Sequence, residues 1–340
     1  MKQRALVLCP GRGSYSRDCL NSLDGLESAG LDVFDKLRAD LGRPTVREMD
    51  TADRFVSAQH IRGENASSLT AGVSIADLDQ INANAFDVVG VIGNSMGWYT
   101  ALGYAGALPM EDCATLIETM AQYQKGNIIG GQIVYPMVDT QWRLDPAAVA
   151  NVTATVSGHR DLHWSIRLGG QAVLGGSEEA LTFASDSLPS VTQGAHTFPI
   201  RLPLHSAFHT ELMQSARAQA KLDLAGLRWQ SPAIPMVDGS GRVHRAGCAN
   251  PAAIREYTLG AQVTETYDLT LSIRTALRTV GPDVVILPGP GSNLGSAIAQ
   301  AMICEKWRGI DSKDAFISRQ NTDPVVLSMR WPDQRERVVA

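Results

Sequence analysis

The stretch FDVVGVIGNSMGWYTAL, residues 86–102, decides the fold of this 340-residue chain. Its first part is a short apolar run rich in β-branched residues, which is typical of a buried parallel strand. The segment from Gly93 to Gly97 then fits the pattern G-x-S-x-G, and an apolar stretch that favours a helix follows it. Small residues on either side of Ser95 let a helix pass close to the preceding strand. The stretch therefore predicts a strand, a sharp turn and a helix, with the Ser95 hydroxyl exposed at the turn.

Ser95 at such a turn has two interpretations. As a nucleophile it would stand at a helix N-terminus, where the helix dipole and the first N–H groups stabilise a developing oxyanion. As a structural residue it would only cap the helix. A G-x-S-x-G match alone is common, but the strand before it and the helix after it favour the catalytic interpretation.

Composition and length indicate a globular protein with a large core. Hydrophobic residues make up 44% of the chain, charged residues make up 19%, and the net charge is -5. Neither disorder nor a nucleic-acid-binding surface is therefore expected, and the partners should be small molecules or proteins. The length suits one large α/β unit that carries a smaller insert.

The cysteines and the N-terminus indicate the compartment. The five cysteines are scattered, with no C-x-x-C pair and no histidine at metal-ligand spacing, so we expect reduced thiols and no metal site. The basic start of the chain is followed by an apolar run that ends at Pro10, which is too short for a signal peptide. No stretch approaches membrane-spanning length. The sequence predicts a cytoplasmic protein.

A change of pattern divides the chain into two predicted subdomains. From residue 132 apolar and polar residues alternate, and the expected elements follow the order β-α-β-β-α-β of a ferredoxin-like fold. The predicted strands are 132–138, 162–168, 171–175 and 196–202, and the predicted helices are 145–150 and 178–187. The predicted fold class is therefore α/β. A large α/β-hydrolase-like subdomain with a parallel sheet (1–130 and 203–340) carries a small ferredoxin-like insert (131–202).

The large subdomain should combine buried strands with surface helices. The expected strands, besides the one in the opening stretch, are 5–9, 234–237 and 283–287, and the expected helices are 67–81, 108–125, 211–222, one from about 251, and 270–280. Residues 20–41 predict one or two further helices, broken near Gly30. The residues after Lys313 are polar and mixed, and they predict a peripheral tail.

A serine nucleophile needs a general base and a group that orients this base. His205 and His209 lie in one short segment after a predicted strand, so either could reach Ser95. The glycine-rich turn at residues 10–15 follows the first strand, at the sheet edge where ligands bind. This turn has neither the spacing of a dinucleotide fingerprint nor that of a P-loop. A backbone N–H near Arg12 could serve there as an oxyanion donor, or the segment could be a plain turn.

Four segments of the chain together resemble a known family. They are PGRGS (10–14), GNSMGWYTAL (93–102), SAFH (206–209) and GPG (289–291). They occur in the order of the malonyl-CoA:acyl carrier protein transacylases and of the acyltransferase domains of polyketide synthases. That family has PGQGS, GHSxGEYxAL, HAFHS and GPG. The resemblance covers nearly the whole chain, and the family also has a ferredoxin-like subdomain at the place of the insert.

The resemblance implies a role for each residue of the site. Ser95 would be the nucleophile and His209 the base, because His209 matches the last histidine of the family motif. The family has no acidic third residue, and the backbone carbonyl of Gln262 would orient the histidine. The backbone N–H groups of Arg12 and Met96 would form the oxyanion hole. No bound cofactor is implied, and the substrates would be phosphopantetheine thioesters of coenzyme A or of an acyl carrier protein.

Departures from the family pattern concern the substrate pocket. Met120 stands where the family has the arginine that binds the malonyl carboxylate, and Lys125 is a poor substitute one and a half turns further on. A buried carboxylate without its cation costs several kcal/mol, so an uncharged acyl group is expected. Arg12 replaces the glutamine of the family motif. The expected pocket residues are Asn94 and Trp98, which also depart from the motif, together with Met120, Ser206 and Phe208.

The sequence therefore predicts a stand-alone, trans-acting acyltransferase. A non-carboxylated acyl group would move by a ping-pong route through Ser95 from a coenzyme A or carrier-protein thioester to an acyl carrier protein, in secondary metabolism or in fatty acid or polyketide synthesis. A monomer is expected. Three alternatives remain open: a hydrolase that clears acyl groups from carrier proteins, a malonyl transferase that uses Lys125 or another cation, and a non-catalytic carrier-protein docking module.

Overall fold

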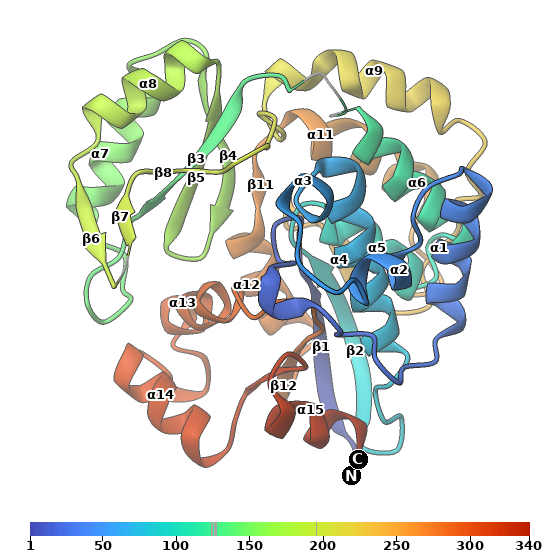
Figure 1. Cartoon of the computed structure of the whole chain (residues 1–340). Helices are drawn as coiled ribbons and strands as arrows, with labels where there is room; N and C mark the ends of the chain where they lie inside the picture. The colour runs from blue at the N-terminus through green and yellow to red at the C-terminus, as the bar shows by residue number, and fades with distance from the viewer. Residues whose placement is uncertain (124, 126–127, 195) are drawn as a thin grey trace.

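A six-stranded sheet forms the centre of the larger part of the chain (Figure 1). The computed structural model describes residues 1–123, 125, 128–194 and 196–340. In spatial order the strands of this main sheet are β10 (Val243–His244), β9 (Met236–Val237), β2 (Phe86–Gly93), β1 (Gln3–Cys9), β12 (Val284–Leu287) and β13 (Val326–Ser328). All neighbouring strands are parallel except β10, which runs antiparallel to β9.

The two central strands bring their carboxyl ends to the same point. β1 and β2 pair in parallel, and their last residues, Cys9 and Gly93, stand opposite each other. The turn at residues 10–13 and the turn at residues 94–96 must therefore leave the sheet side by side. The carboxyl edge of a parallel sheet is where open α/β folds bind their ligands.

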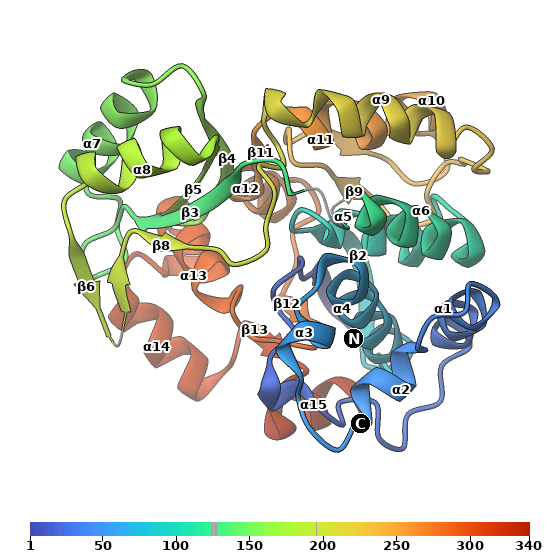
Figure 2. The same ribbon diagram turned by 45° about the horizontal axis from the view of Figure 1, so that its top comes forward.

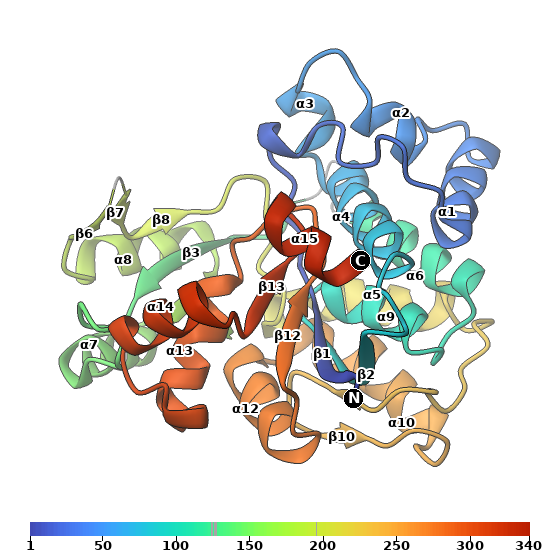
Figure 3. The ribbon, with the colours of Figure 1, turned by 90° about the horizontal axis from the view of Figure 1, so that it is seen from below.

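Helices pack on both faces of the main sheet (Figures 2 and 3). The α-helices of this part are α1 (Ala29–Asp40), α2 (Val46–Asp50), α3 (Ser57–His60), α4 (Gly63–Leu78), α5 (Gly97–Tyr104), α6 (Met110–Gln122), α9 (Gln214–Asp223), α10 (Pro251–Glu256), α11 (Gln262–Thr264), α12 (Leu269–Thr279), α13 (Gly295–Glu305), α14 (Lys313–Thr322) and α15 (Pro332–Val339). The short 3₁₀ helices are η1 (Arg17–Cys19), η2 (Glu211–Met213) and η4 (Trp307–Gly309), and η3 (Tyr257–Ala261) is a π-helix. Helix α4 is buried along nearly its whole length, between α1, α5 and α6.

A second sheet lies beside the first and has the ferredoxin-like strand order. Its strands lie in the order β11-β4-β5-β3-β8. They are β3 (Gly131–Pro136), β4 (Leu162–Leu168), β5 (Gln171–Gly176), β8 (Ile200–Arg201) and β11 (Tyr267–Asp268). β3, β4, β5 and β8 pair antiparallel, whereas β11 joins β4 in parallel from a later part of the chain. Helices α7 (Pro146–Ser157) and α8 (Glu178–Ser187) cover the outer face of this sheet (Figure 1).

The predicted fold class, a parallel α/β unit with a ferredoxin-like insert, is confirmed. The boundaries at residues 131 and 202 stay a prediction. The predicted strand 196–202 is wrong as one strand: β7 (His196–Phe198) forms a separate ribbon with β6 (Val191–Gln193), and only β8 joins the sheet. Pro199, which has no N–H to donate to a ladder, lies between them.

Two further expectations need correction. The helix expected over 20–41 does not break near Gly30, because Ser28 caps α1 and Gly30 lies in its first turn. The residues after Lys313 are not a peripheral tail. Strand β13 extends the main sheet next to β12, and its three residues are buried (Figure 3). Among the described residues no helix has the length and apolarity needed to cross a membrane.

Candidate active site

Ser95 lies at a strained turn between β2 and α5. Its φ of 54° is in the left-handed region, which residues with a side chain rarely adopt. A Cβ atom added to Gly93 would overlap the backbone of Gly97, and one added to Gly97 would overlap the carbonyl oxygen of Cys9 in β1. Both glycines of the G-x-S-x-G pattern are therefore required by the close approach of α5 to β1 and β2. Such strain persists where the surrounding structure fixes the backbone, and it is common at functional sites.

His209 reaches Ser95 from a segment more than a hundred residues later. The Ser95 Oγ lies 2.7 Å from His209 Nε2. His209 is almost fully buried, and its φ of 62° is also in the left-handed region. Its backbone N–H donates a hydrogen bond of 2.9 Å to the carbonyl of Val263. The loop that carries His209 is thus held against the segment around α11.

Gln262 fixes both members of this pair. His209 Nδ1 donates a hydrogen bond of 2.5 Å to the backbone carbonyl of Gln262, because a carbonyl can only accept. Nε2 is therefore left as the acceptor for the Ser95 hydroxyl. The side chain of Gln262 donates from Nε2 to the carbonyl of Ser95 at 3.1 Å, and its Oε1 accepts from the Tyr99 hydroxyl at 2.7 Å.

Burial determines the charge of the histidine. The pKa of His209 is lowered from 6.5 to about 4 by burial, which the hydrogen bond to the Gln262 carbonyl opposes only in part. The imidazole is consequently neutral at neutral pH. A neutral imidazole can accept the proton of a serine hydroxyl, which is what general-base chemistry needs.

The two backbone amides expected to form an oxyanion hole belong to turns that touch. Met96 is the N-cap residue of α5, and the first N–H groups of a helix have no acceptor within the helix. The turn that contains Arg12 packs directly on the elbow, because a Cβ added at Gly11 would lie 2.6 Å from the carbonyl oxygen of Asn94. Arg12 and Met96 both line the cavity at Ser95.

A cavity of about 270 Å³ opens at Ser95 and His209 between the two sheets. One wall of the cavity is the inner face of the small sheet, which is mainly apolar there. The opposite wall comes from α4 and α6. The residues that line the cavity include Ser67, Met120, Gln132, Val134, Ile166 and Phe208. Of the expected pocket residues, Asn94, Met120, Ser206 and Phe208 line this cavity.

Trp98 does not line the cavity, so its interpretation as a pocket residue is wrong. Its side chain is fully buried on the other side of α5. The indole N–H donates a hydrogen bond of 2.9 Å to Thr258, and the ring packs edge-on against Tyr257. Trp98 therefore serves to pack α5 against the π-helix η3.

The charged groups at the cavity are few. Arg12 is the one arginine or lysine among the described residues that line it, and its Nη2 donates to the carbonyl of Leu204 at 2.8 Å. Burial lowers the pKa of Arg12 to about 10, so its charge remains at neutral pH. His205 also lines the cavity, and burial together with the positive charge of Arg12 lowers its pKa to about 3. Lys125 is exposed and is not among the lining residues.

Several residues of the site were not expected from the sequence. Gln132 and Ser67 line the cavity from β3 and α4. Tyr267 donates a hydrogen bond of 2.5 Å to the carbonyl of Gly93, and its ring centroid lies 5.3 Å from that of His209. Of these residues only Gln132 could have been suspected from the sequence, because it is a polar residue in an apolar strand. Among the described residues no group of histidine, cysteine or acidic side chains could hold a metal ion.

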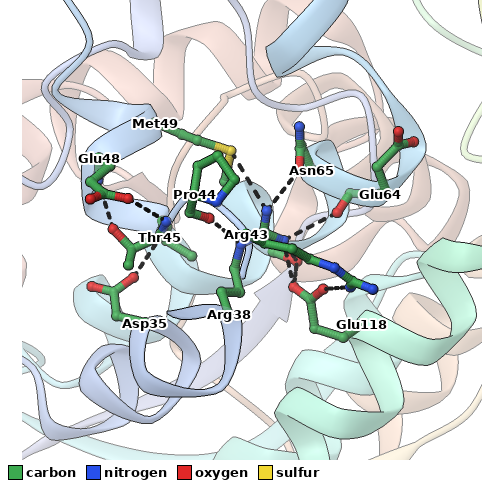
Figure 4. A network of polar contacts seen from close by, with 12 residues as sticks. Asp35, Arg38, Arg43, Pro44, Thr45, Glu48, Met49, Glu64, Asn65 and Glu118 are labelled. Carbon is green, nitrogen blue, oxygen red and sulfur yellow. Dashed lines mark hydrogen bonds and ion pairs between the residues drawn. The ribbon is translucent and has the colours of Figure 1, made fainter. Parts of the chain in front are cut away.

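Helix α6, which carries Met120, is held from behind by a buried ionic network (Figure 4). Glu118 forms ion pairs of 2.6 Å with both Arg38 and Arg43. Arg38 is fully buried and also donates to Ser68 Oγ and to the Asn65 side chain. The network connects α1, α4 and α6, and it faces away from the cavity because Glu118 is not a lining residue. It therefore fixes the wall from which Met120 lines the cavity.

The chain has the fold of the malonyl-CoA:acyl carrier protein transacylases and of polyketide synthase acyltransferase domains. The transacylase of Xanthomonas oryzae pv. oryzae is 21% identical, with a TM-score of 0.74 over 99% of this chain and 98% of its own. That of Synechocystis sp. PCC 6803 is 16% identical, with a TM-score of 0.72 over 99% of both chains. The acyltransferase domain of the second salinomycin polyketide synthase module is 19% identical, with a TM-score of 0.72 over all of this chain and 72% of the other.

Sequence comparison by itself finds no matching family model and no similar curated protein. The fold implied by the four motifs is nevertheless confirmed over the full length of the chain.

Proposed function

We propose that this protein is an acyltransferase that carries an acyl group on Ser95 between two phosphopantetheine thiols. The observation that carries the proposal is the 2.7 Å contact between Ser95 Oγ and His209 Nε2, two residues that line the same cavity. The fold shared with solved structures named as transacylases and an acyltransferase domain supports it.

In the first half-reaction His209 Nε2 takes the proton of the Ser95 hydroxyl while Oγ attacks the thioester carbonyl carbon. The N–H groups of Met96 and Arg12 would donate to the oxyanion. The C–S bond then breaks, the leaving thiolate takes the proton from His209, and an ester on Ser95 remains. In the second half-reaction a second phosphopantetheine thiol loses its proton to His209 and attacks this ester, and the reverse sequence restores the Ser95 hydroxyl.

The acyl group should carry no carboxylate. Met120 is buried in the cavity wall and provides no charge for a carboxylate. A carboxylate buried without a cation costs several kcal/mol, which disfavours malonyl groups. Arg12 is a cation at the cavity that could pair with a carboxylate. Its guanidinium, however, already donates a hydrogen bond to the Leu204 carbonyl. Labelling by malonyl-CoA therefore tests this part of the proposal.

The donor would be an acyl thioester of coenzyme A or of a carrier protein, and the acceptor an acyl carrier protein. No cofactor needs to be bound, because every step uses side chains and backbone groups of this chain. A trans-acting monomer in the cytoplasm that serves secondary metabolism, fatty acid synthesis or polyketide synthesis fits this chemistry.

Mass spectrometry of the intact protein tests the proposal. The protein is incubated with acetyl-, butyryl-, hexanoyl- and malonyl-CoA, and we expect an acyl adduct from the uncharged thioesters. The adduct should be absent in Ser95→Ala, with thermal denaturation as the control for folding. Addition of a holo carrier protein should discharge the adduct onto the carrier, whereas the apo carrier, which lacks the thiol, should not. An adduct on Ser95→Ala, or none on the wild type, would refute the proposal, and equally fast loss to water would identify a hydrolase.

A further inference from the structure

Gln132 is a buried polar residue on the apolar wall of the cavity. It is only 3% exposed. Side chains alternate between the faces of a strand, and on β3 Gln132 and Val134 line the cavity while Ile133 and Tyr135 belong to the separate core under α7 and α8. The side chain of Gln132 therefore projects from the face of the small sheet that meets the substrate.

The orientation of the Gln132 amide is determined by its neighbours. Nε2 donates to Ser165 Oγ at 2.7 Å and lies 3.4 Å from the carbonyl of Phe208. Because a backbone carbonyl can only accept, the nitrogen rather than the oxygen must face Phe208. Both amide hydrogens are thus used. Among the described residues Oε1 has no hydrogen-bond partner.

A second polar group on the opposite wall has the same property. Ser67 on α4 is 3% exposed and lines the cavity. Its hydroxyl makes no hydrogen bond with another described residue. Gln132 Oε1 is thus a fixed acceptor on the mainly apolar face of the small sheet, and the Ser67 hydroxyl, which can donate or accept, is one of several further polar groups of a cavity that Asn94, Gln171 and Asn293 also line.

We propose that the cavity selects an uncharged acyl group that carries a hydroxyl on its chain, with Gln132 as the residue that recognises it. The inference rests on the proposed function. A hydroxyl on the acyl chain can donate to Gln132 Oε1, whereas a plain alkyl chain would bury Oε1 without a partner. A site built to hydrogen-bond a substrate hydroxyl discriminates strongly against the analogue that lacks it.

Competition between matched thioesters tests the inference. The values of kcat/KM for acylation of Ser95 are compared for butyryl-CoA and for 2-, 3- and 4-hydroxybutyryl-CoA. We expect at least one hydroxylated isomer to be preferred over butyryl-CoA by roughly tenfold or more. In Gln132→Met, which keeps the length of the side chain, this preference should fall to about onefold.

Ser165→Ala is the matched control. Ser165 holds the Gln132 amide and donates to the Phe208 carbonyl at 2.9 Å, next to His209, but it does not line the cavity. We expect this variant to slow acylation by both types of thioester and to weaken the preference without abolishing it, because the Phe208 carbonyl still faces Nε2 of Gln132. A role of Gln132 limited to supporting the His209 loop would give Gln132→Met the same pattern as Ser165→Ala.

The outcomes separate the inference from the proposed function. Equal or faster acylation by butyryl-CoA than by every hydroxylated isomer would overturn the inference and leave the acyltransferase proposal intact. A preference for the hydroxylated thioester that persists in Gln132→Met would likewise overturn the inference and leave the acyltransferase proposal intact. The absence of any Ser95 adduct with all four thioesters would overturn both. The wild-type comparison needs no variant, so a Gln132→Met protein that does not fold leaves the test in place.

Discussion

The pH dependence of acylation should be unusual for a histidine base. An ordinary histidine has a pKa near 6.5, whereas burial lowers the pKa of His209 to about 4. The form that can accept a proton from Ser95 is the neutral imidazole. We therefore expect the acylation rate to stay constant from pH 8 down to about pH 5 and to fall only as the pH approaches 4.

The fraction of neutral imidazole differs most between an ordinary histidine and the buried His209 near pH 5.5. A base with a pKa of 6.5 would be neutral in roughly one molecule in ten at this pH, and acylation would drop about tenfold from its plateau. A base with a pKa of about 4 would be neutral in more than about nine molecules in ten, and the rate would hardly change. A single rate ratio between pH 7.5 and pH 5.5 therefore distinguishes the two cases.

Single-turnover acylation by a saturating acyl-CoA, stopped by acid and read by intact mass spectrometry, measures this ratio. Between pH 6.5 and about 4 the unfolded chain binds a proton at His209 that the folded chain does not, so the stability falls as the pH falls through this window. Thermal denaturation at each pH must accompany the rates. The variant His205→Asn should keep the same inflection, since the pKa of His205 is lowered to about 3. An inflection near pH 6.5 in the wild type would refute the reasoning from burial.

Three other perturbations have clear expected results. Gly97→Ala places a Cβ on a backbone oxygen of β1, so it should abolish the Ser95 adduct and lower the free energy of unfolding in urea by about 2 kcal/mol or more. Gly226→Ala is the control, because its added Cβ meets nothing within 4 Å, and it should change both quantities little. Met120→Arg should raise labelling by malonyl-CoA relative to butyryl-CoA by at least about tenfold, and Met120→Leu should not. An unchanged ratio in Met120→Arg would show that residue 120 does not select between charged and uncharged acyl groups. Glu118→Gln should cost about 3–5 kcal/mol in urea because its fully buried arginine partner loses its countercharge, whereas Asp40→Asn, from an exposed pair, should cost less than about 1 kcal/mol.

The elbow could be predicted from sequence because its determinants are adjacent residues. Gly93 is required by the close approach of the Gly97 backbone, and Gly97 is required by the close approach of β1, so the pattern of small residues around Ser95 reflects these contacts directly. The choice between His205 and His209 could not be made from the residues themselves, since both lie in one loop and both line the cavity. Only the alignment with the family motif distinguished them. The structure places His209, and not His205, within hydrogen-bonding distance of Ser95.

The rest of the site depends on tertiary contacts that a sequence pattern does not contain. Trp98 lies three residues after Ser95, but the direction of its side chain depends on how α5 is rotated against η3. The inner cavity wall is built by the small sheet, so Gln132 becomes a site residue only after that sheet packs against α4 and α6. Strand β13 has only three residues, and the last of them is a serine. Short strands of this kind carry too few residues for their alternation to be recognised.

The arrangement around Gln262 explains how this pair of residues could work without an acidic third group. A buried carboxylate next to the imidazole would favour the charged form and raise the pKa of His209. A neutral carbonyl orients the ring through Nδ1 and leaves burial as the larger influence, so the pKa is lowered to about 4 and the resting base is neutral. The same residue holds the carbonyl of Ser95 through its side chain, and it is itself fixed by Tyr99. Because the orienting group is a backbone carbonyl, substitution of Gln262 removes the side-chain contacts to Ser95 and Tyr99 and not the acceptor for His209. Gln262→Ala should therefore slow acylation and leave the inflection near pH 4 in place, whereas a shift of the inflection toward 6.5 would show that the side chain also maintains the burial of the base.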